Sequence, residues 1–159
     1  MGMTTGEREA LIEQFAAGYD AVIAALDGIT GAEWEAREAP GEWSPRQIVH
    51  HLCDGEMNAA ARIRFLIAEQ QPVIMSYDQD RWTEMLYTDS RPIEPSLAAL
   101  KAAREATTPL LRLITDAQWG NIGSHSAKGQ MTAEDWLSWY GPHAHDHADQ
   151  IRRARAAAE

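Results

Sequence analysis

Two histidines near the C-terminal end of the chain have the spacing of a metal site. His143 and His147 lie four residues apart in the run 142–151, which is predicted to be helical. Residues four apart lie one turn apart on the same face of a helix, so both imidazoles can reach one metal ion. His145, between them, faces about 160° away from His147 at helical pitch and is excluded from the site.

A third imidazole is available in a second predicted helix. Ser44 is placed to cap this helix, Pro45 to occupy its first position and Gln47 its third, which is a strong helix-start signal. An apolar stripe follows at helical spacing, formed by Ile48, Leu52, Ala59, Ile63 and Leu66. His51 falls on this buried stripe, whereas His50 lies about 100° away from it.

Packing alone explains one buried histidine better than it explains three. A single core histidine is usually bonded to a carbonyl, and His143 and His147 could belong to a polar helix face. Burial of imidazole nitrogens without partners costs roughly 1–3 kcal/mol per group, and a shared metal would satisfy them together. We therefore predict a metal site formed by His51, His143 and His147. Three imidazoles leave a coordination position for water or substrate, as in catalytic zinc sites, and also suit nickel, iron and copper.

Two further side chains lie on nearly the same helix line as His51. Asn58 and Arg62 follow it by seven and eleven residues, and both are predicted to bind substrate. Arg62 would hold a carboxylate or another anionic group, or alternatively pair with a carboxylate of the bundle. Gln150 continues the line of the C-terminal histidine pair and is predicted to orient one of these ligands.

The elements that carry these residues are predicted to be four long helices. They span roughly residues 5–26, a segment from 45 onward, 95–116, and a segment from 132 that the Gly141-Pro142 pair is expected to kink or interrupt. The connection at 71–94 is expected to be irregular except for one turn near 80–85. The Gly/Ser/Asn-rich connection after residue 120 is expected to be a loop with His125 exposed. This pattern predicts an all-α four-helix bundle with long connections, forming a single domain over residues 1–159.

Composition excludes several classes of protein. Of the 159 residues, 45% are hydrophobic, which suffices for a folded core, and the net charge of −10 argues against a nucleic-acid groove or an anionic membrane surface. Cys53 is the only cysteine, so no intrachain disulfide can form. No secretory signal and no apolar run of about 20 residues are visible, so we expect a cytoplasmic protein.

The motifs around the proposed ligands resemble those of the DinB-like superfamily, in particular its YfiT-like branch. The resemblance rests on two runs, Pro40-Gly41-Glu42-Trp43-Ser44-Pro45-Arg46-Gln47-Ile48-Val49-His50-His51-Leu52 and His143-x-x-x-His147-x-x-Gln150-Ile151. It implies a four-helix bundle, often dimeric, in which His51, His143 and His147 hold a divalent metal. Glu56 departs from the pattern, because the YfiT-like branch tends to have histidine there.

The resemblance also implies a function. Such proteins are described as metal-dependent hydrolases, and some relatives transfer or isomerise groups with thiols such as bacillithiol or mycothiol. We accordingly expect a divalent metal, zinc or nickel before others, that activates a water or a low-molecular-weight thiol for hydrolysis or thiol transfer on a small molecule. The alternative is a non-catalytic, metal-stabilised bundle that binds a ligand, and a third reading has histidines that only form hydrogen bonds. The resemblance also implies that the protein is a homodimer.

Overall fold

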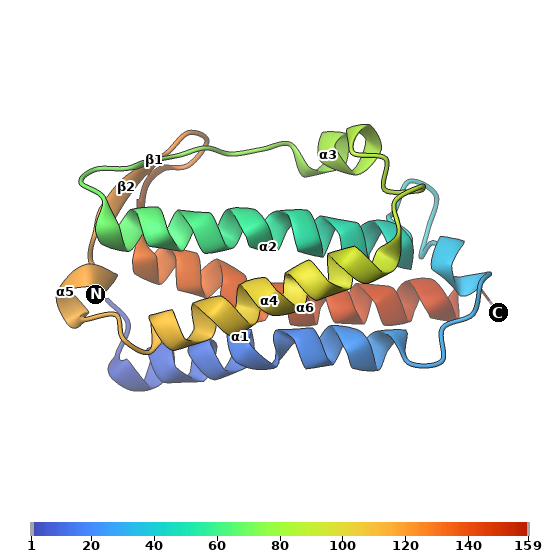
Figure 1. Ribbon diagram of the computed structural model, residues 1–159, viewed down its shortest axis with the longest axis horizontal. Helices are drawn as coiled ribbons and strands as arrows, with labels where there is room; N and C mark the ends of the chain where they lie inside the picture. The colour runs from blue at the N-terminus through green and yellow to red at the C-terminus, as the bar shows by residue number, and fades with distance from the viewer. Residues whose placement is uncertain (1, 159) are drawn as a thin grey trace.

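A computed structural model describes residues 2–158 of the chain as a helical bundle with a small sheet at one end (Figure 1). The four long helices are α1 (Thr5–Leu26), α2 (Pro45–Ala68), α4 (Ile93–Leu111) and α6 (Ala133–Ala156). The shorter elements are η1 (Glu33–Glu35), α3 (Gln79–Met85), α5 (Asp116–Trp119), β1 (Val73–Ile74), β2 (Ile122–His125) and β3 (Gly129–Thr132).

The bundle is a square in which each long helix packs against two others. Helix α1 contacts α4 and α6, and α2 also contacts both of them. Figure 1 shows α1 and α6 running in one direction and α2 and α4 in the other. Because α2 and α4 are parallel, the connection between them must return along the length of the bundle, and this accounts for its length. The predicted four-helix bundle with long connections is confirmed.

The helix starts are those that the sequence predicts. Ser44 accepts a hydrogen bond from the backbone N–H of Gln47, and the Gln47 side chain accepts one from the backbone N–H of Ser44. Thr4 and Glu7 cap α1 in the same way, and Thr132 caps α6 with Asp135. Each pair satisfies two backbone donors that a helix N-terminus leaves unpaired.

One expected helix end was wrong, because α4 ends at Leu111 rather than near residue 116. Of the two outcomes expected at Gly141-Pro142, an interruption does not occur, since α6 runs through this pair as one helix. The reason is packing against α1: a Cβ on Gly141 would lie 3.0 Å from Leu11 Cδ2, so the glycine allows a close helix contact. That contact supports the helix where proline removes one backbone hydrogen bond.

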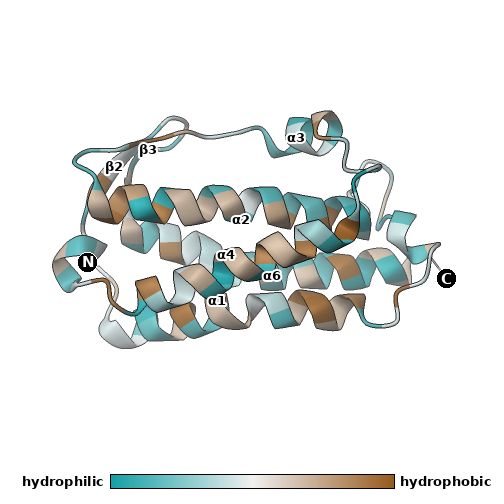
Figure 2. Ribbon diagram, viewed as in Figure 1, coloured by the Kyte–Doolittle hydropathy of each residue, from teal (hydrophilic) through white to brown (hydrophobic). Residues whose placement is uncertain are grey.

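The hydrophobic core consists of two clusters separated by polar residues. One cluster includes Phe15, Ile63 and Trp136, and the other includes Val22 and Leu52. Figure 2 shows that each long helix carries hydrophobic and hydrophilic residues along its length, as amphipathic helices do. Along every long helix the change from one cluster to the other occurs near the middle, and the functional side chains described below lie at this level.

The three-stranded sheet was not predicted. Strand β1 pairs in parallel with β2, and β2 pairs antiparallel with β3, so the order is β1-β2-β3. Gly123 is required in β2, because a Cβ there would lie 2.9 Å from Leu66 Cδ2 and 3.0 Å from the Pro72 carbonyl oxygen. Gly129 has a φ of 80° where β3 begins. The sheet joins the two long connections and holds both against one end of α2.

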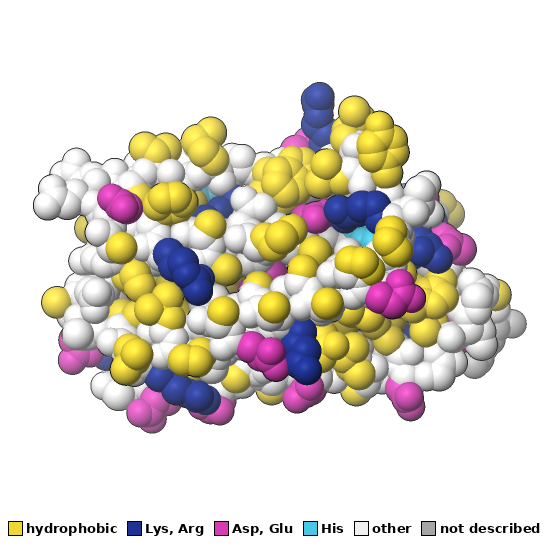
Figure 3. All heavy atoms as spheres, in the orientation of Figure 1, with side chains coloured by type: hydrophobic (Ala, Val, Ile, Leu, Met, Phe, Trp, Pro, Cys, Tyr) yellow, Lys and Arg dark blue, Asp and Glu magenta, His cyan; other side chains and the backbone are white. Residues whose placement is uncertain are grey.

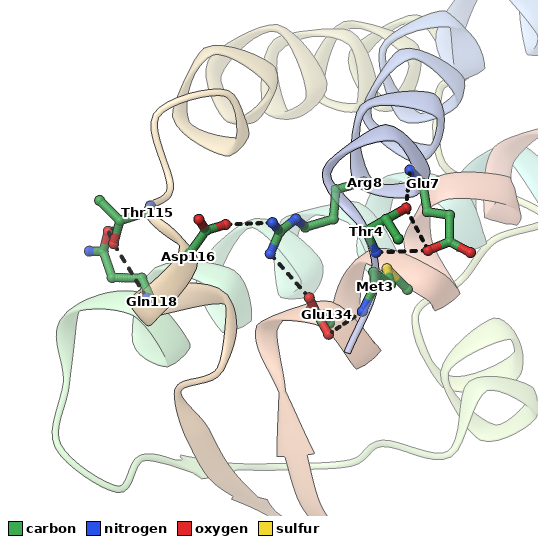
Figure 4. Close-up of polar contacts among 8 residues, drawn as sticks. All are labelled: Met3, Thr4, Glu7, Arg8, Thr115, Asp116, Gln118 and Glu134. Atoms are coloured by element: carbon green, nitrogen blue, oxygen red, sulfur yellow. Dashed lines mark hydrogen bonds and ion pairs between the residues drawn. The ribbon is translucent and has the colours of Figure 1, made fainter. Parts of the chain in front are cut away.

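The same end of the bundle is tied together by Arg8 (Figure 4). Its guanidinium contacts the carboxylates of Asp116 in α5 and Glu134 in α6, the latter at 3.2 Å. Glu134 also accepts a hydrogen bond of 3.0 Å from the backbone N–H of Met3.

No helix within residues 2–158 is long and apolar enough to cross a membrane.

Candidate metal centre

The bundle brings the three predicted histidines together. His51 projects from α2, and His143 and His147 project from α6, the helix that packs against α2. Each ring offers one nitrogen, and these three nitrogen atoms all lie within 4.8 Å of one another. The ring centroids are 4.7 to 5.5 Å apart. Three ring nitrogens at these separations can approach a single ion.

The unpaired ring nitrogens are what a metal would satisfy. His51 Nε2 and His143 Nδ1 are buried and have no hydrogen-bond partner among the residues described. His147 Nδ1 lies 2.8 Å from Gln150 Oε1, so this amide oxygen accepts the ring N–H and the other nitrogen carries the lone pair. Because buried polar atoms without partners are costly, the three rings fit a shared divalent metal better than they fit an apolar core.

The protonation state of the three rings also suits metal binding. Burial lowers the pKa of His51 to about 3 and holds the pKa of His143 well below its usual range. Burial lowers the pKa of His147 as well, partly offset by its bond to Gln150. All three imidazoles are therefore neutral near pH 7 in the metal-free protein. Neutral imidazole is the form that binds a metal.

Each of the two neighbouring histidines has one ring nitrogen close to an oxygen of another helix. His50 is fully buried, and its Nδ1 lies 2.8 Å from Ser96 Oγ on α4. His145 points to α1, where its Nε2 lies 2.8 Å from the carbonyl oxygen of Gln14. The Trp43 ring packs against the three histidines, and its centroid lies 4.6 Å from that of His51. Neither His50 nor His145 belongs to the group of rings that can share a metal.

Replacing Gln150 tests its role beside His147. We expect Gln150→Leu to weaken metal binding roughly 10- to 100-fold, because the ring loses the acceptor that fixes its orientation. Gln150→Glu keeps an oxygen acceptor and should retain most of the affinity. Competition with a chromophoric chelator measures both values. Equal affinity of the wild type and Gln150→Leu would contradict the assignment.

The buried neutral histidines also predict a pH dependence of stability in the metal-free protein. The folded-state pKa of His51 is about 3, below the ordinary value of 6.5, so the unfolded chain binds protons more readily. The stability gained from keeping this ring neutral is present above about pH 6.5 and is lost as the pH falls toward 3. Thermal unfolding after chelation, followed between about pH 7.5 and 5, should show a shallower decline for His51→Gln. Parallel curves for the two proteins would contradict this prediction.

A pocket of about 380 Å³ opens beside the histidines. His51, His143 and Arg62 line it from the helices, and the two long connections supply other walls, including Tyr77 and His125. His125 was expected to be exposed in a loop, and this was wrong: only 6% of its surface is accessible, because it lies on β2 and faces Trp139. Figure 3 shows that little histidine surface is visible on the face drawn there.

Of the two residues predicted to bind substrate, only Arg62 reaches the pocket. Its guanidinium donates to the hydroxyl oxygen of Tyr140 at 2.8 Å and to the carbonyl oxygen of Met75. It pairs with no carboxylate among residues 2–158, so the alternative of an ion pair within the bundle does not occur in this part of the chain. Asn58 instead donates to the backbone oxygen of Asp54 at 2.9 Å and is not part of the pocket wall.

Tyr77 and Tyr140 line the pocket and were missed by the sequence reasoning. A Cβ on Gly55 would lie 3.1 Å from the Tyr77 hydroxyl and 3.8 Å from His143 Cε1, so this glycine makes room where the two rings approach α2. Burial raises the pKa of Tyr77 to about 12 and also raises that of Tyr140, so both remain hydrogen-bond donors at neutral pH. Tyr77 lies in the connection between α2 and α4, between β1 and α3, where no periodic pattern in the sequence points to it.

Fold and site together define a class: helical bundles with a group of three imidazoles beside a pocket. Residues 14–151 match the model of the DinB superfamily, and the chain belongs to that superfamily. The protein named "Putative metal-dependent hydrolase YfiT" from Bacillus subtilis is 35% identical over 130 residues, which cover 80% of this chain and 72% of that protein. A relative from Oceanobacillus iheyensis with the same description is 34% identical over 111 residues, covering 70% of this chain and 64% of its own.

The fold is likewise that of a relative of known structure. The solved structure of YfiT from Bacillus subtilis, described as having an unusual four-helix bundle topology, matches with a TM-score of 0.87 and 29% identity. The match covers 94% of this chain and 86% of that one. The arrangement of α1, α2, α4 and α6 described above is thus shared with a member of the same group.

Proposed function

We propose that this protein is a divalent-metal-dependent enzyme that activates a water or a low-molecular-weight thiol for hydrolysis or thiol transfer on a small molecule. The observation that carries the proposal is the group of three neutral imidazoles, with ring nitrogens within 4.8 Å of one another. Two of them, His51 and His143, line a pocket of about 380 Å³. The names of the relatives as metal-dependent hydrolases support it. Zinc or nickel suits these ligands.

The residues around the centre have complementary tasks in this proposal. His51, His143 and His147 hold the metal, and Gln150 holds the His147 ring in place through the bond to its Nδ1. A divalent metal held by these residues would act as a Lewis acid and would lower the pKa of a coordinated water or thiol. Arg62 binds the substrate in the pocket, and Tyr77 and Tyr140 offer hydroxyl groups to it. Trp43 covers the imidazoles and keeps bulk water from that side.

Metal removal and restoration test the enzyme proposal. We expect purified protein to contain about one divalent metal per chain, to lose it and its turnover on chelation, and to regain turnover with zinc or nickel. The substrates to be screened are ester and amide substrates, and an electrophile such as monochlorobimane offered with several thiols. A fully metal-loaded protein without turnover on any of these would favour the non-catalytic ligand-binding function instead.

A further inference from the structure

The pocket beside the three histidines is positively charged, although the chain as a whole is acidic. The full sequence has 24 acidic against 14 basic residues, yet none of the eleven residues that line the pocket is Asp or Glu. Two of the eleven, Arg62 and Lys128, carry a positive charge. The pocket lining therefore has a net positive charge, whereas the chain as a whole has a net negative charge.

Neither cation forms an ion pair with a carboxylate of residues 2–158. Among residues 2–158, Arg8, Arg91 and Arg104 each pair with a carboxylate, and Arg62 and Lys128 do not. Arg62 uses two of its N–H groups on neutral oxygens and lies 5.4 Å from the Tyr77 ring centroid. These contacts fix the plane of the guanidinium and leave other N–H donors free. A guanidinium held in this way can bind a planar carboxylate through two parallel hydrogen bonds.

His125 at the end of β2 and Lys128 in the β2–β3 turn also line the pocket. Lys128 Nζ lies 3.9 Å from the Trp139 ring centroid, so the ring holds the ammonium at the pocket. His125 Nδ1 accepts hydrogen bonds from the backbone N–H groups of Ala127 and Lys128, at 3.2 Å each, and the neutral ring therefore carries its proton on Nε2. The pKa of His125 is lowered by burial and then by the charges of Arg62 and Lys128, which agrees with a positive potential here.

We propose that the substrate carries a carboxylate group, bound by Arg62 and Lys128, while its reacting group faces the three histidines. This inference rests on the proposed function, because it names the substrate class of the same site. A carboxylate fits better than a neutral group, which would leave both cations without a counter-charge. The divalent metal at the other wall would add to the same positive potential. Arg62 and Lys128 therefore determine specificity, and the β2–β3 turn supplies part of the recognition.

Calorimetric titration with succinate, and with its neutral analogue succinamide, tests this inference. We expect wild-type protein to bind succinate, and Arg62→Gln and Lys128→Gln each to weaken that binding roughly tenfold or more, as for loss of a charged hydrogen bond. Lys101→Gln is the matched control, because Lys101 also lies over an aromatic ring, Tyr19, but outside this pocket. Lys128 is exposed and its replacement should not affect folding, so this variant decides the test even if Arg62→Gln is unstable.

A metal-free background separates this inference from the proposed function. In His147→Ala, succinate binding should persist and should still fall when Arg62 is replaced. Loss of all succinate binding in His147→Ala would mean that the metal alone holds the carboxylate, which would overturn the inference and leave the metal centre intact. Conversely, a wild type that contains no metal but binds succinate through Arg62 would refute the enzyme proposal alone. Equal binding of succinamide, tighter binding of inorganic phosphate, or no binding of succinate would each overturn the carboxylate assignment.

Discussion

Replacing His147 with alanine is expected to abolish metal binding, whereas replacing His145 is not. The two residues stand two apart on α6, but only His147 belongs to the group of three ring nitrogens, and His145 contacts the Gln14 carbonyl oxygen. Loss of one of three ligands should lower the affinity by at least about 100-fold, more than the loss of a residue that only orients a ligand. Metal content per chain, measured by mass spectrometry after dialysis, gives the result directly.

The same comparison extends to the other two ligands. His51→Ala and His143→Ala should lose the metal to a similar extent, and each should lose the turnover found with the wild type. Circular dichroism shows whether each variant keeps its helical content, which distinguishes a lost ligand from a lost fold. Similar metal content in His145→Ala and His147→Ala would mean that the three imidazoles only form hydrogen bonds, which is the third reading of the sequence.

The sequence predicts the parts of this protein that depend on local signals. The capping pair Ser44 and Gln47 sets where α2 begins, and the position of α2 then decides that His51, and not His50, faces His143. Likewise, helical pitch alone excludes His145. These conclusions need only the period of the helix and the chemistry of its first turn. For this reason the three histidines can be grouped from the amino-acid sequence alone.

The walls of the pocket could not be predicted in the same way. Strand β1 has two residues, too few to show an alternating pattern, and its partner β2 contains a glycine and a serine, which suggest a loop. The parallel pairing of Ile74 with His125 joins residues that are far apart in the chain. The burial of His125 follows from that pairing, and so does the position of Lys128. Long-range contacts of this kind have no local signature.

The ion pair of Glu56 and Arg104 is a second long-range feature, and it lies between the two halves of the hydrophobic core. Arg104 Nε and Nη2 lie 2.8 and 2.7 Å from Glu56 Oε2, and both side chains are almost inaccessible to solvent. Arg104 also donates to the Phe15 carbonyl oxygen and lies 4.3 Å from the Phe15 ring centroid. Gly18 makes room for it, since a Cβ there would lie 2.2 Å from Arg104 Nη1.

Breaking this pair is expected to be strongly destabilising. Arg104→Met should lower the free energy of unfolding by about 3–5 kcal/mol, because it leaves the Glu56 carboxylate buried without a partner. Burial already raises the pKa of Glu56, so the variant should take up a proton there and lose less stability at low pH than at pH 8. Urea denaturation at both pH values measures this. Arg112→Met, which removes an exposed pair with Glu13 at the C-terminal end of the same helix, is the control and should cost about 0.5 kcal/mol or less.

The double variant Glu56→Leu with Arg104→Met shows whether the ion pair adds net stability, or whether a single replacement is costly only because it leaves one buried charge unpaired. Without either charge the two halves of the core could join, and we expect most of the stability lost in Arg104→Met to return. The coupling between the two changes should then reach about 2 kcal/mol or more. If the two single losses simply added, the side chains would act independently, and the short contacts between them would contribute nothing specific. If the coupling has the expected size, the stability lost in Arg104→Met comes from the unpaired charge of Glu56. The three neutral histidines, which also carry no charge, lie near the same middle part of the bundle.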